Sequence, residues 1–249
     1  MGKIVAIGGG HIGSLGQPIE TTEIDKEIVR LSESNSPRLL FIPTASTDAE
    51  SYVEAVDNHF GKDLGCIIDT LFLIKEKPGI SEIRERVFNA NIIYVGGGNT
   101  LKMLRIWRGL GVDNVLHEAY GRGVVMSGLS AGAICWFKYC SSDSRKFANP
   151  NAGLIKITGL NFIDALCCPH YNTEADRKPH LKALMRKTSG VALAIDDCCA
   201  FEVMDDKYRV IGSKEDANAY KVYWRKGEFY EEIIKKQTGF LTLNSLLAK

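Results

Sequence analysis

The chain has 249 residues, 45% of them hydrophobic, and its formal net charge at pH 7 is only +1. This balance provides neither a basic field for nucleic acid nor an acidic arm, so we expect a small partner instead. No apolar run approaches the roughly 18 residues of a membrane span, and the first residues lack a signal-peptide pattern. We therefore expect a cytoplasmic protein with no nucleic-acid or membrane partner.

Apolar runs of strand length alternate with amphipathic stretches through the first 130 residues. The apolar runs lie at 3–9, 38–45, 66–74, 91–98 and 123–130. Stretches with helical spacing lie between them, at 21–34, 48–64 and 81–91. Strands that are apolar on both faces and alternate with helices are typical of a parallel sheet covered by helices. We predict an α/β fold whose ligands bind beyond the carboxyl ends of the strands.

The pattern loosens after residue 150. Further strand segments follow at 159–170 and 191–204, and aromatic, β-branched stretches at 208–212 and 219–233 indicate a small antiparallel C-terminal region. The polar segment 141–153 is predicted to be a loop. Because the sequence shows no repeat, low-complexity tract or linker, we expect residues 1–249 to form a single domain.

Ser130 lies in the sequence GLSAG, between the apolar run GVVM and the apolar, helix-like stretch AICWF. A serine between glycines at a strand-to-helix turn matches the GxSxG pattern of nucleophilic serines. Such a turn holds the hydroxyl above the sheet, next to the backbone N–H of Ala131. A purely structural tight turn uses the same small residues, so the pattern alone leaves both interpretations open.

A base for that serine is sought among five histidines, His11, His59, His117, His170 and His180. We interpret His59, His117 and His180 as solvated, because each lies in a polar or charged stretch. His170 ends the apolar run CCPH, and a histidine at the carboxyl end of a strand faces the same rim as Ser130. His170 is therefore the candidate base, and the alternative is a histidine that only caps its strand.

Carboxylates that would orient such an imidazole also follow apolar runs. Asp196 and Asp197 end the run VALAI, and Asp143 lies in the polar loop after the serine. Asp164 and Asp176 are less well placed. Spacing in the sequence does not choose among them.

Two turns contain three consecutive glycines. In YVGGGNT, at 94–100, they precede the helix-capping residue Asn99 and expose backbone N–H groups suited to an anion or an oxyanion. In AIGGGHIG, at 6–13, they approach the dinucleotide-binding pattern GxGxxG. The acidic residue expected after a second strand is missing there, because Glu33 falls in a helical stretch.

The seven cysteines are odd in number, and four form the adjacent pairs 167–168 and 198–199. These pairs lack the two-residue gap of a zinc site. We expect buried thiols that pack as small hydrophobic side chains, with a metal site as the alternative.

With these residues placed, the chain resembles the peptidase E family of serine peptidases, which includes cyanophycinase-like members. The resemblance rests on VGGGNT at 95–100, GLSAGAICWF at 128–137, the PHY around His170 and the IDD around Asp197. It implies a three-layer α/β/α sandwich with a mostly parallel, flavodoxin-like sheet, related to the class I glutamine amidotransferases with serine in place of cysteine. The family implies no metal and no organic cofactor.

The resemblance also implies roles for individual residues. Ser130 matches the nucleophile of the family and His170 its base. The backbone N–H groups of Gly98 and Ala131 would form the oxyanion hole.

The family points to two residues for the third member of the triad, Asp197 and Asp143. We favour Asp197, because it follows a strand that fixes its position, whereas Asp143 lies in a loop.

Peptidase E removes an N-terminal aspartate from Asp-X dipeptides, and such a substrate needs cationic or N–H-rich groups. We place Asn99, Arg145 and Arg177 in the substrate-binding set, with Lys146 and Lys178 as further cations in the same two loops. The alternative for each cation is a solvated surface charge.

We therefore predict a serine peptidase that cleaves a peptide bond in a small substrate through an acyl-enzyme on Ser130. One alternative is a hydrolase of β-linked aspartyl or ester substrates, as in cyanophycinase-like relatives. Others are a non-catalytic module that holds a small anionic ligand and a nucleotide-dependent oxidoreductase. The sequence leaves the physiological substrate and a homodimer open.

Overall fold

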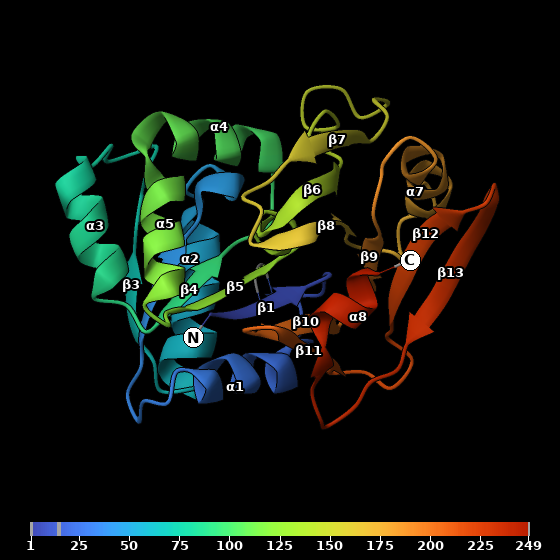
Figure 1. The fold of residues 1–249 in the computed structure, drawn as a ribbon. Helices are drawn as coiled ribbons and strands as arrows, with labels where there is room; N and C mark the ends of the chain where they lie inside the picture. The colour runs from blue at the N-terminus through green and yellow to red at the C-terminus, as the bar shows by residue number, and fades with distance from the viewer. Residues whose placement is uncertain (1, 14–15, 249) are drawn as a thin grey trace.

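The first sheet is built around five parallel strands in the order β3-β2-β4-β5-β1 (Figure 1). In this computed structural model, which describes residues 2–13 and 16–248, those strands are β1 (Lys3–Ile7), β2 (Arg38–Ile42), β3 (Ile67–Thr70), β4 (Ile92–Val95) and β5 (Val125–Leu129). Every residue of β1, β4 and β5 is buried, as expected for strands covered on both faces. The predicted parallel sheet is confirmed.

Three antiparallel strands extend this sheet beyond β1. They are β10 (Cys199–Met204), β11 (Lys207–Gly212) and β14 (Leu241–Thr242). The eight strands therefore form a mixed sheet, with β1 at the junction of its parallel and antiparallel parts.

A second sheet of six strands has the order β13-β12-β9-β8-β6-β7. Its strands are β6 (Phe137–Ser142), β7 (Ile155–Thr158), β8 (Ile163–Cys168), β9 (Ala192–Ile195), β12 (Ala219–Arg225) and β13 (Glu228–Ile234). Strands β6, β8 and β9 are parallel, and the others pair antiparallel. The segment 191–204 thus splits into β9 and β10, which belong to different sheets.

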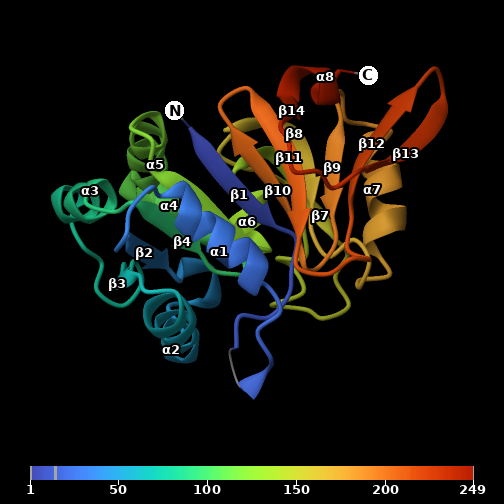
Figure 2. The same ribbon diagram turned by 90° about the horizontal axis from the view of Figure 1, so that it is seen from below.

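Helices cover both faces of the first sheet (Figures 1 and 2). On one face lie α1 (Thr22–Leu31), α2 (Glu50–Val56) and the π-helix η3 (Asp57–Asp63), which bury Ile24, Val56 and Phe60 against it. The opposite face is covered by α3 (Ile80–Phe88), α4 (Thr100–Leu110) and α5 (Val112–Gly121). The expected α/β sandwich with helix-flanked sheets is confirmed.

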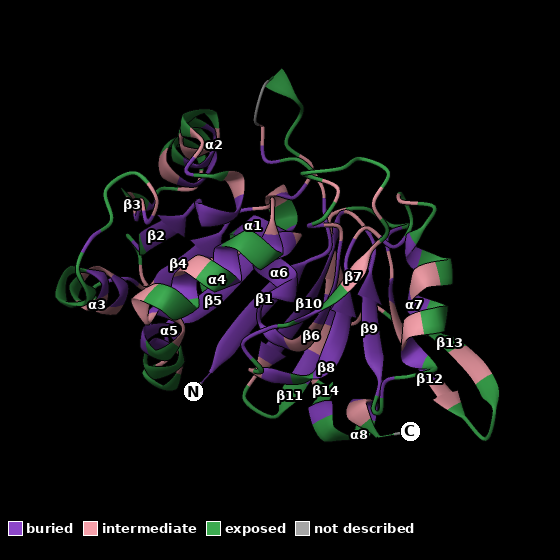
Figure 3. Ribbon diagram, turned by 90° about the horizontal axis from the view of Figure 1, so that it is seen from above, coloured by how far each residue is buried: buried purple, intermediate pink, exposed green. Residues whose placement is uncertain are grey.

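The remaining helices are short or lie on the second sheet. Helix α7 (Arg177–Met185) packs on the outer face of that sheet, and α8 (Leu243–Leu247) lies close to the C-terminus. A 3₁₀ turn, η2 (Thr44–Ser46), follows β2. When the chain is coloured by burial, the strands are mainly buried and the outer faces of the helices are exposed (Figure 3).

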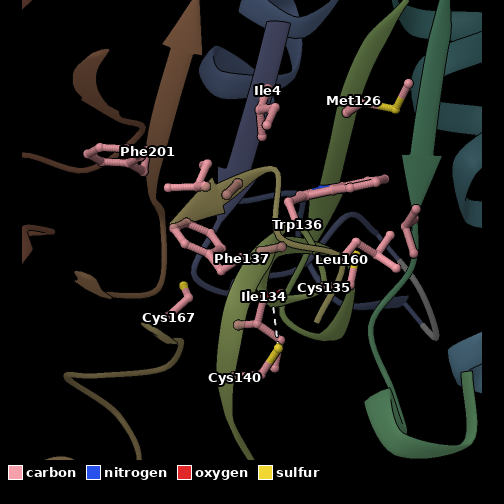
Figure 4. Packing of buried hydrophobic residues seen from close by; sticks show 14 of the residues in the cluster. Ile4, Met126, Ile134, Cys135, Trp136, Phe137, Cys140, Leu160, Cys167 and Phe201 are labelled. Carbon is pink, nitrogen blue, oxygen red and sulfur yellow. Dashed lines mark hydrogen bonds between the residues drawn. The ribbon is translucent and has the colours of Figure 1, made fainter. Parts of the chain in front are cut away.

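The largest hydrophobic core contains residues from both sheets. Figure 4 shows Ile4 of β1 and Phe201 of β10 packed near Phe137 of β6 and Cys167 of β8. All seven cysteines are free and buried, which confirms that they pack as small side chains. Burial raises the pKa of Cys140, whose thiol donates to the carbonyl of Ile134 at 3.0 Å.

The helix after Ser130 is shorter than the sequence suggested. Helix α6 (Ala131–Ile134) has four residues, and β6 begins at Phe137, so the stretch AICWF is not a continuous helix. Phe137 instead pairs with Ile163 of β8 inside the core. Strand pairing of a buried aromatic side chain overrides the helical pattern here.

Among residues 2–13 and 16–248, no helix combines the length and apolarity needed to cross a membrane.

Candidate active site

Ser130 occupies the turn between β5 and α6 with φ of 55° and ψ of −106°. A positive φ at a non-glycine residue costs about 1–3 kcal/mol and needs support from its surroundings. The Ser130 N–H donates to the carbonyl of Ile7 in β1 at 3.0 Å. A Cβ at Gly132 would overlap the carbonyl of Val95, and one at Gly128 would lie 2.6 Å from the same oxygen. The glycines of GLSAG therefore permit a strained turn that packs closely against β4.

His170 reaches Ser130 from the second sheet. It follows β8, and its Nε2 lies 2.7 Å from Ser130 Oγ. Its backbone also has positive φ, at 52°, and its N–H donates to the carbonyl of Gly8 at 3.2 Å. The backbone of His170 is thus anchored to Gly8, directly after β1, as well as to its own strand.

Asp197 lies where the chain crosses from β9 in the second sheet to β10 in the first. Its Oδ1 is 2.6 Å from His170 Nδ1, and its Oδ2 accepts a hydrogen bond from Thr173 Oγ1 at 2.9 Å. The Asp197 N–H donates to Asn172 Oδ1 at 3.0 Å. Ser130, His170 and Asp197 are therefore joined by a continuous series of hydrogen bonds at the boundary between the two sheets.

The pKa of the Asp197 carboxyl group favours its ionised form, which can accept a hydrogen bond from His170. Burial raises the pKa of its carboxyl group, but hydrogen bonds and charge interactions, chiefly with His170 and also with Thr173, outweigh burial and hold the pKa below its ordinary value. An ionised Asp197 accepts the Nδ1–H of the imidazole, which leaves Nε2 free to accept the hydroxyl proton of Ser130.

The turn after β1 contains glycines because side chains at positions 8 and 9 would overlap neighbouring residues. A Cβ on Gly9 would overlap both Asp197 Oδ1 and His170 Nδ1. A Cβ on Gly8 would overlap the carbonyl of Asp196. These glycines let the turn pack against the His170–Asp197 pair and the crossing between the sheets, which accounts for the motif that approaches a dinucleotide pattern.

The backbone N–H groups of Gly98 and Ala131, the expected oxyanion donors, have no acceptor among residues 2–13 and 16–248. Gly98 has φ of 136°, and a Cβ there would overlap the carbonyl of Ala45. The turn containing Gly98 is next to the serine, because a Cβ on Gly97 would lie 3.7 Å from the Cβ of Ser130. Both expected oxyanion donors therefore lack an acceptor within the described residues, and the turn of Gly98 adjoins Ser130.

Both polar atoms of the Asn99 side chain form hydrogen bonds with other protein groups. Its Oδ1 caps α4 by accepting from the N–H of Lys102 at 3.0 Å, and its Nδ2 donates to the carbonyl of Ser144 at 3.2 Å. The Leu101 N–H donates to Ser144 Oγ at 3.0 Å. These contacts tie the loop after β6 to the turn after β4.

The cations of the expected substrate-binding set have different surroundings. Arg177 is 1% exposed and donates from Nε to Glu174 at 2.8 Å and from Nη1 to the carbonyl of Ser141 at 3.0 Å. Lys146 pairs with Asp176 at 2.7 Å. Arg145 is exposed and forms no ion pair within the part of the chain that the structure describes. Arg177 is therefore not a solvated surface charge.

Asp143, the other aspartate considered for the triad, is half-buried in the loop after β6. Its carbonyl accepts from the N–H of Lys146 at 2.7 Å. No hydrogen bond or ion pair joins its side chain to His170 in the described residues, where the Nδ1 of His170 is paired with Asp197 instead. The structure brings Asp197, and not Asp143, to the imidazole.

The prediction that His59 is solvated was wrong. His59 is 1% exposed, and its Nε2 lies 2.8 Å from Oδ2 of the buried Asp25, because η3 turns this side chain toward the sheet. His117 is exposed and stacks on Phe162, as a surface residue does. His180 is half-buried, and burial lowers its pKa.

A cleft of about 420 Å³ opens beside Asp197. Thr173, Asn172, His11 and Lys214 are among the residues that line it. Of Ser130, His170 and Asp197, only Asp197 lines this space. Across residues 2–13 and 16–248, no three His, Cys, Asp or Glu side chains are grouped to hold a metal ion.

The sequence interpretation missed Thr173, Asn172 and Gly9. Thr173 and Asn172 lie within three residues of His170, so their closeness in sequence was the available signal. Gly9 carried no such signal, because its contact with Asp197 joins residues far apart in the chain.

A sequence model of Peptidase family S51 matches residues 4–211. Among curated proteins, the chain is 36% identical over 233 residues to the uncharacterized peptidase YgaJ of Bacillus subtilis (strain 168), covering 93% of this chain and 96% of that protein. It is 23% identical to a protein named peptidase E from Nostoc sp. (strain PCC 7120), covering 82% and 84%.

Two solved structures are similar in fold. A peptidase from an acI-B1 actinobacterium gives a TM-score of 0.73 at 20% identity and covers 97% of both chains. A putative peptidase E protein from Listeria monocytogenes gives a TM-score of 0.63 at 20% identity and covers 85% of this chain and 98% of its own.

Proposed function

We infer that this chain, which belongs to Peptidase family S51 and is a serine-type peptidase, hydrolyses small peptides by attack of Ser130 on the scissile carbonyl carbon. The observation that carries this proposal is the continuous hydrogen-bonded chain from Ser130 Oγ through His170 to Asp197, with distances of 2.7 and 2.6 Å. A hydroxyl in this arrangement can lose its proton as it attacks.

In the proposed reaction, His170 Nε2 takes the proton of Ser130 as Oγ bonds to the carbonyl carbon. The N–H groups of Gly98 and Ala131 donate to the oxyanion that forms. His170 then gives the proton to the leaving amine, which breaks the peptide bond and leaves an acyl group on Ser130. A water molecule releases that group by the same steps, with His170 again accepting a proton.

We propose that an acidic substrate side chain is recognised by Arg145. This guanidinium is exposed, whereas Asn99 and Arg177 direct polar atoms to protein groups. Asn99 and Arg177 then hold the loop that carries Arg145, through Ser144 and Ser141. A cation of this kind favours Asp-X peptides among small substrates.

The test is labelling with a fluorophosphonate probe, which reacts with activated serines. We expect wild-type protein to be labelled and both Ser130→Ala and His170→Ala to lose labelling by at least about 1000-fold. Ser127→Ala is the matched control, because it removes a hydroxyl from the same strand that bonds only to the carbonyl of Ile93. It should label at the wild-type rate.

Labelling of Ser130→Ala at the wild-type rate would contradict the proposal that Ser130 is the nucleophile. A panel of α-linked and β-linked aspartyl peptides, with neutral peptides for comparison, then tests the substrate class. Cleavage of the β-linked peptides alone would replace the dipeptidase with a cyanophycinase-like activity. Arg145→Ala should raise KM for acidic peptides and leave neutral ones unchanged.

A further inference from the structure

In the turn after β4, three of the four backbone N–H groups of residues 96–99 donate hydrogen bonds to other parts of the protein. The Gly96 N–H donates to the carbonyl of Ile42 at 3.4 Å, and the Asn99 N–H donates to that of Ala45 at 2.8 Å. The Gly97 N–H donates to the hydroxyl of Tyr52 at 3.1 Å. Only the Gly98 N–H of these four has no acceptor within residues 2–13 and 16–248.

Tyr52 is the one side chain among these three acceptors, since the other two are backbone carbonyls. It comes from α2, which lies on the face of the sheet opposite to α4. Its ring packs on Phe41, with centroids 5.2 Å apart, and on the turn itself. A Cβ on Gly96 would lie only 2.9 Å from the ring of Tyr52. Glycine at 96 therefore lets the tyrosine reach Gly97.

The Tyr52 hydroxyl remains protonated under ordinary conditions. Burial raises its pKa to about 12. Its oxygen is therefore a neutral acceptor for the Gly97 N–H over the whole range in which the protein would work, and no change of charge near neutral pH would release the turn.

We propose that Tyr52 is a positioning residue for the oxyanion turn. By holding the Gly97 N–H, its hydroxyl fixes the Gly96–Gly97 peptide plane, and so limits the adjoining Gly97–Gly98 peptide, whose N–H is to face the oxyanion beside Ser130. This role rests on the proposed function of Gly98 as an oxyanion donor. Small errors in the placement of such a donor reduce catalysis, because its value depends on a preorganised position.

Tyr94 provides a matched comparison. It is fully buried in β4, its ring also lies against Phe41, with centroids 6.1 Å apart, and its hydroxyl has no hydrogen-bond partner in the described structure. Tyr52→Phe and Tyr94→Phe remove the same atom from neighbouring rings. Only the first removes a contact with the turn.

The experiment measures two quantities on wild type and both variants. The first is the rate of fluorophosphonate labelling as a function of probe concentration. The second is the hydrogen-exchange rate of the Gly97 amide. We expect Tyr52→Phe to lower the maximal labelling rate about tenfold, with an unchanged half-saturating probe concentration, and to speed Gly97 exchange about tenfold. Tyr94→Phe should match wild type in both.

Wild-type labelling by Tyr52→Phe would overturn the inference, as would an equal loss in Tyr94→Phe, because a general effect of repacking around Phe41 would then explain the result. Slow Gly97 exchange in Tyr52→Phe would also overturn it. Failure of the proposed function is recognised separately, since Ser130→Ala would then label like wild type. The exchange measurement needs no activity and decides whether Tyr52 holds the turn.

Discussion

The turn after β1 and the turn after β4 each contain three consecutive glycines, at 8–10 and 96–98, but their surroundings differ. At 8–10 the missing side chains make room for other residues, because a Cβ on Gly9 would overlap the His170–Asp197 pair. At 96–98 the backbone itself is the part that matters for the proposed function, since the Gly98 N–H has no acceptor within the described residues and is the oxyanion donor that we propose. The same short motif thus provides space in one place and a hydrogen-bond donor in the other.

The turn at 8–10 also organises the site through its carbonyl groups. Those of Gly8 and Gly9 accept from the N–H groups of His170 and Cys198, at 3.2 and 2.9 Å. This turn therefore contacts both the segment that follows β8 and the segment that connects β9 to β10. The turn at 96–98 is instead held by the β2–η2 segment and Tyr52.

The largest effect is expected for Gly9→Ala. The added methyl group would push His170 and Asp197 apart, which removes the orientation of the imidazole and should lower fluorophosphonate labelling about 1000-fold. Circular dichroism should show a folded protein. Gly79→Ala, where a Cβ meets open space, is the control and should keep the wild-type rate. A folded Gly9→Ala that labels normally would show that the turn does not position the pair.

For Gly98→Ala we expect a smaller loss of fluorophosphonate labelling, about 100-fold. An alanine side chain is disfavoured by the positive φ of residue 98 and would overlap the carbonyl of Ala45. The backbone would have to shift, which would displace the N–H of residue 98, the proposed oxyanion donor. Gly97→Ala tests the same turn without this conflict, since its Cβ would make only ordinary contacts at 3.6 Å or more. It should change the labelling rate by no more than a few-fold. Equal losses in the two variants would contradict the assignment of Gly98 as the donor.

The smallest effect is expected for Thr173→Val, which removes the hydrogen bond to Asp197 Oδ2 and should cost about 0.5–1 kcal/mol. The pKa of Asp197 is lowered on folding, so its ionised form contributes stability above the ordinary Asp pKa of about 3.9, and that contribution is lost as the pH falls through the lower folded value. The melting temperatures of wild type and Thr173→Val should therefore differ most near pH 7 and converge at acid pH.

Thr188→Val is the control for this comparison, because the Thr188 hydroxyl donates to the carbonyl of Leu184 and touches no carboxylate. Its effect on melting temperature should not depend on pH. A pH-independent difference for Thr173→Val as well would mean that its hydroxyl does not stabilise the charge of Asp197.

Much of the fold could be predicted because strand and helix patterns are local. The buried runs around β1, β4 and β5 and the glycines around Ser130 are visible in single segments of sequence. The length of α6 was not predictable in this way, because Phe137 joins a strand only when β8 is present to pair with it. The burial of His59 likewise depends on a distant partner, Asp25.

The sequence by itself determined the parallel half of the first sheet, the turn between a strand and a helix at Ser130, and the strand ends that carry His170 and Asp197. These features follow from hydrophobic periodicity and from residues that only certain turns accept. The tertiary structure alone decided that β9 and β10 enter different sheets, and so that Asp197 meets His170 while Asp143 does not. It also decided the contacts of Gly9 and Tyr52, because pairs so distant along the chain meet only when the whole core has formed.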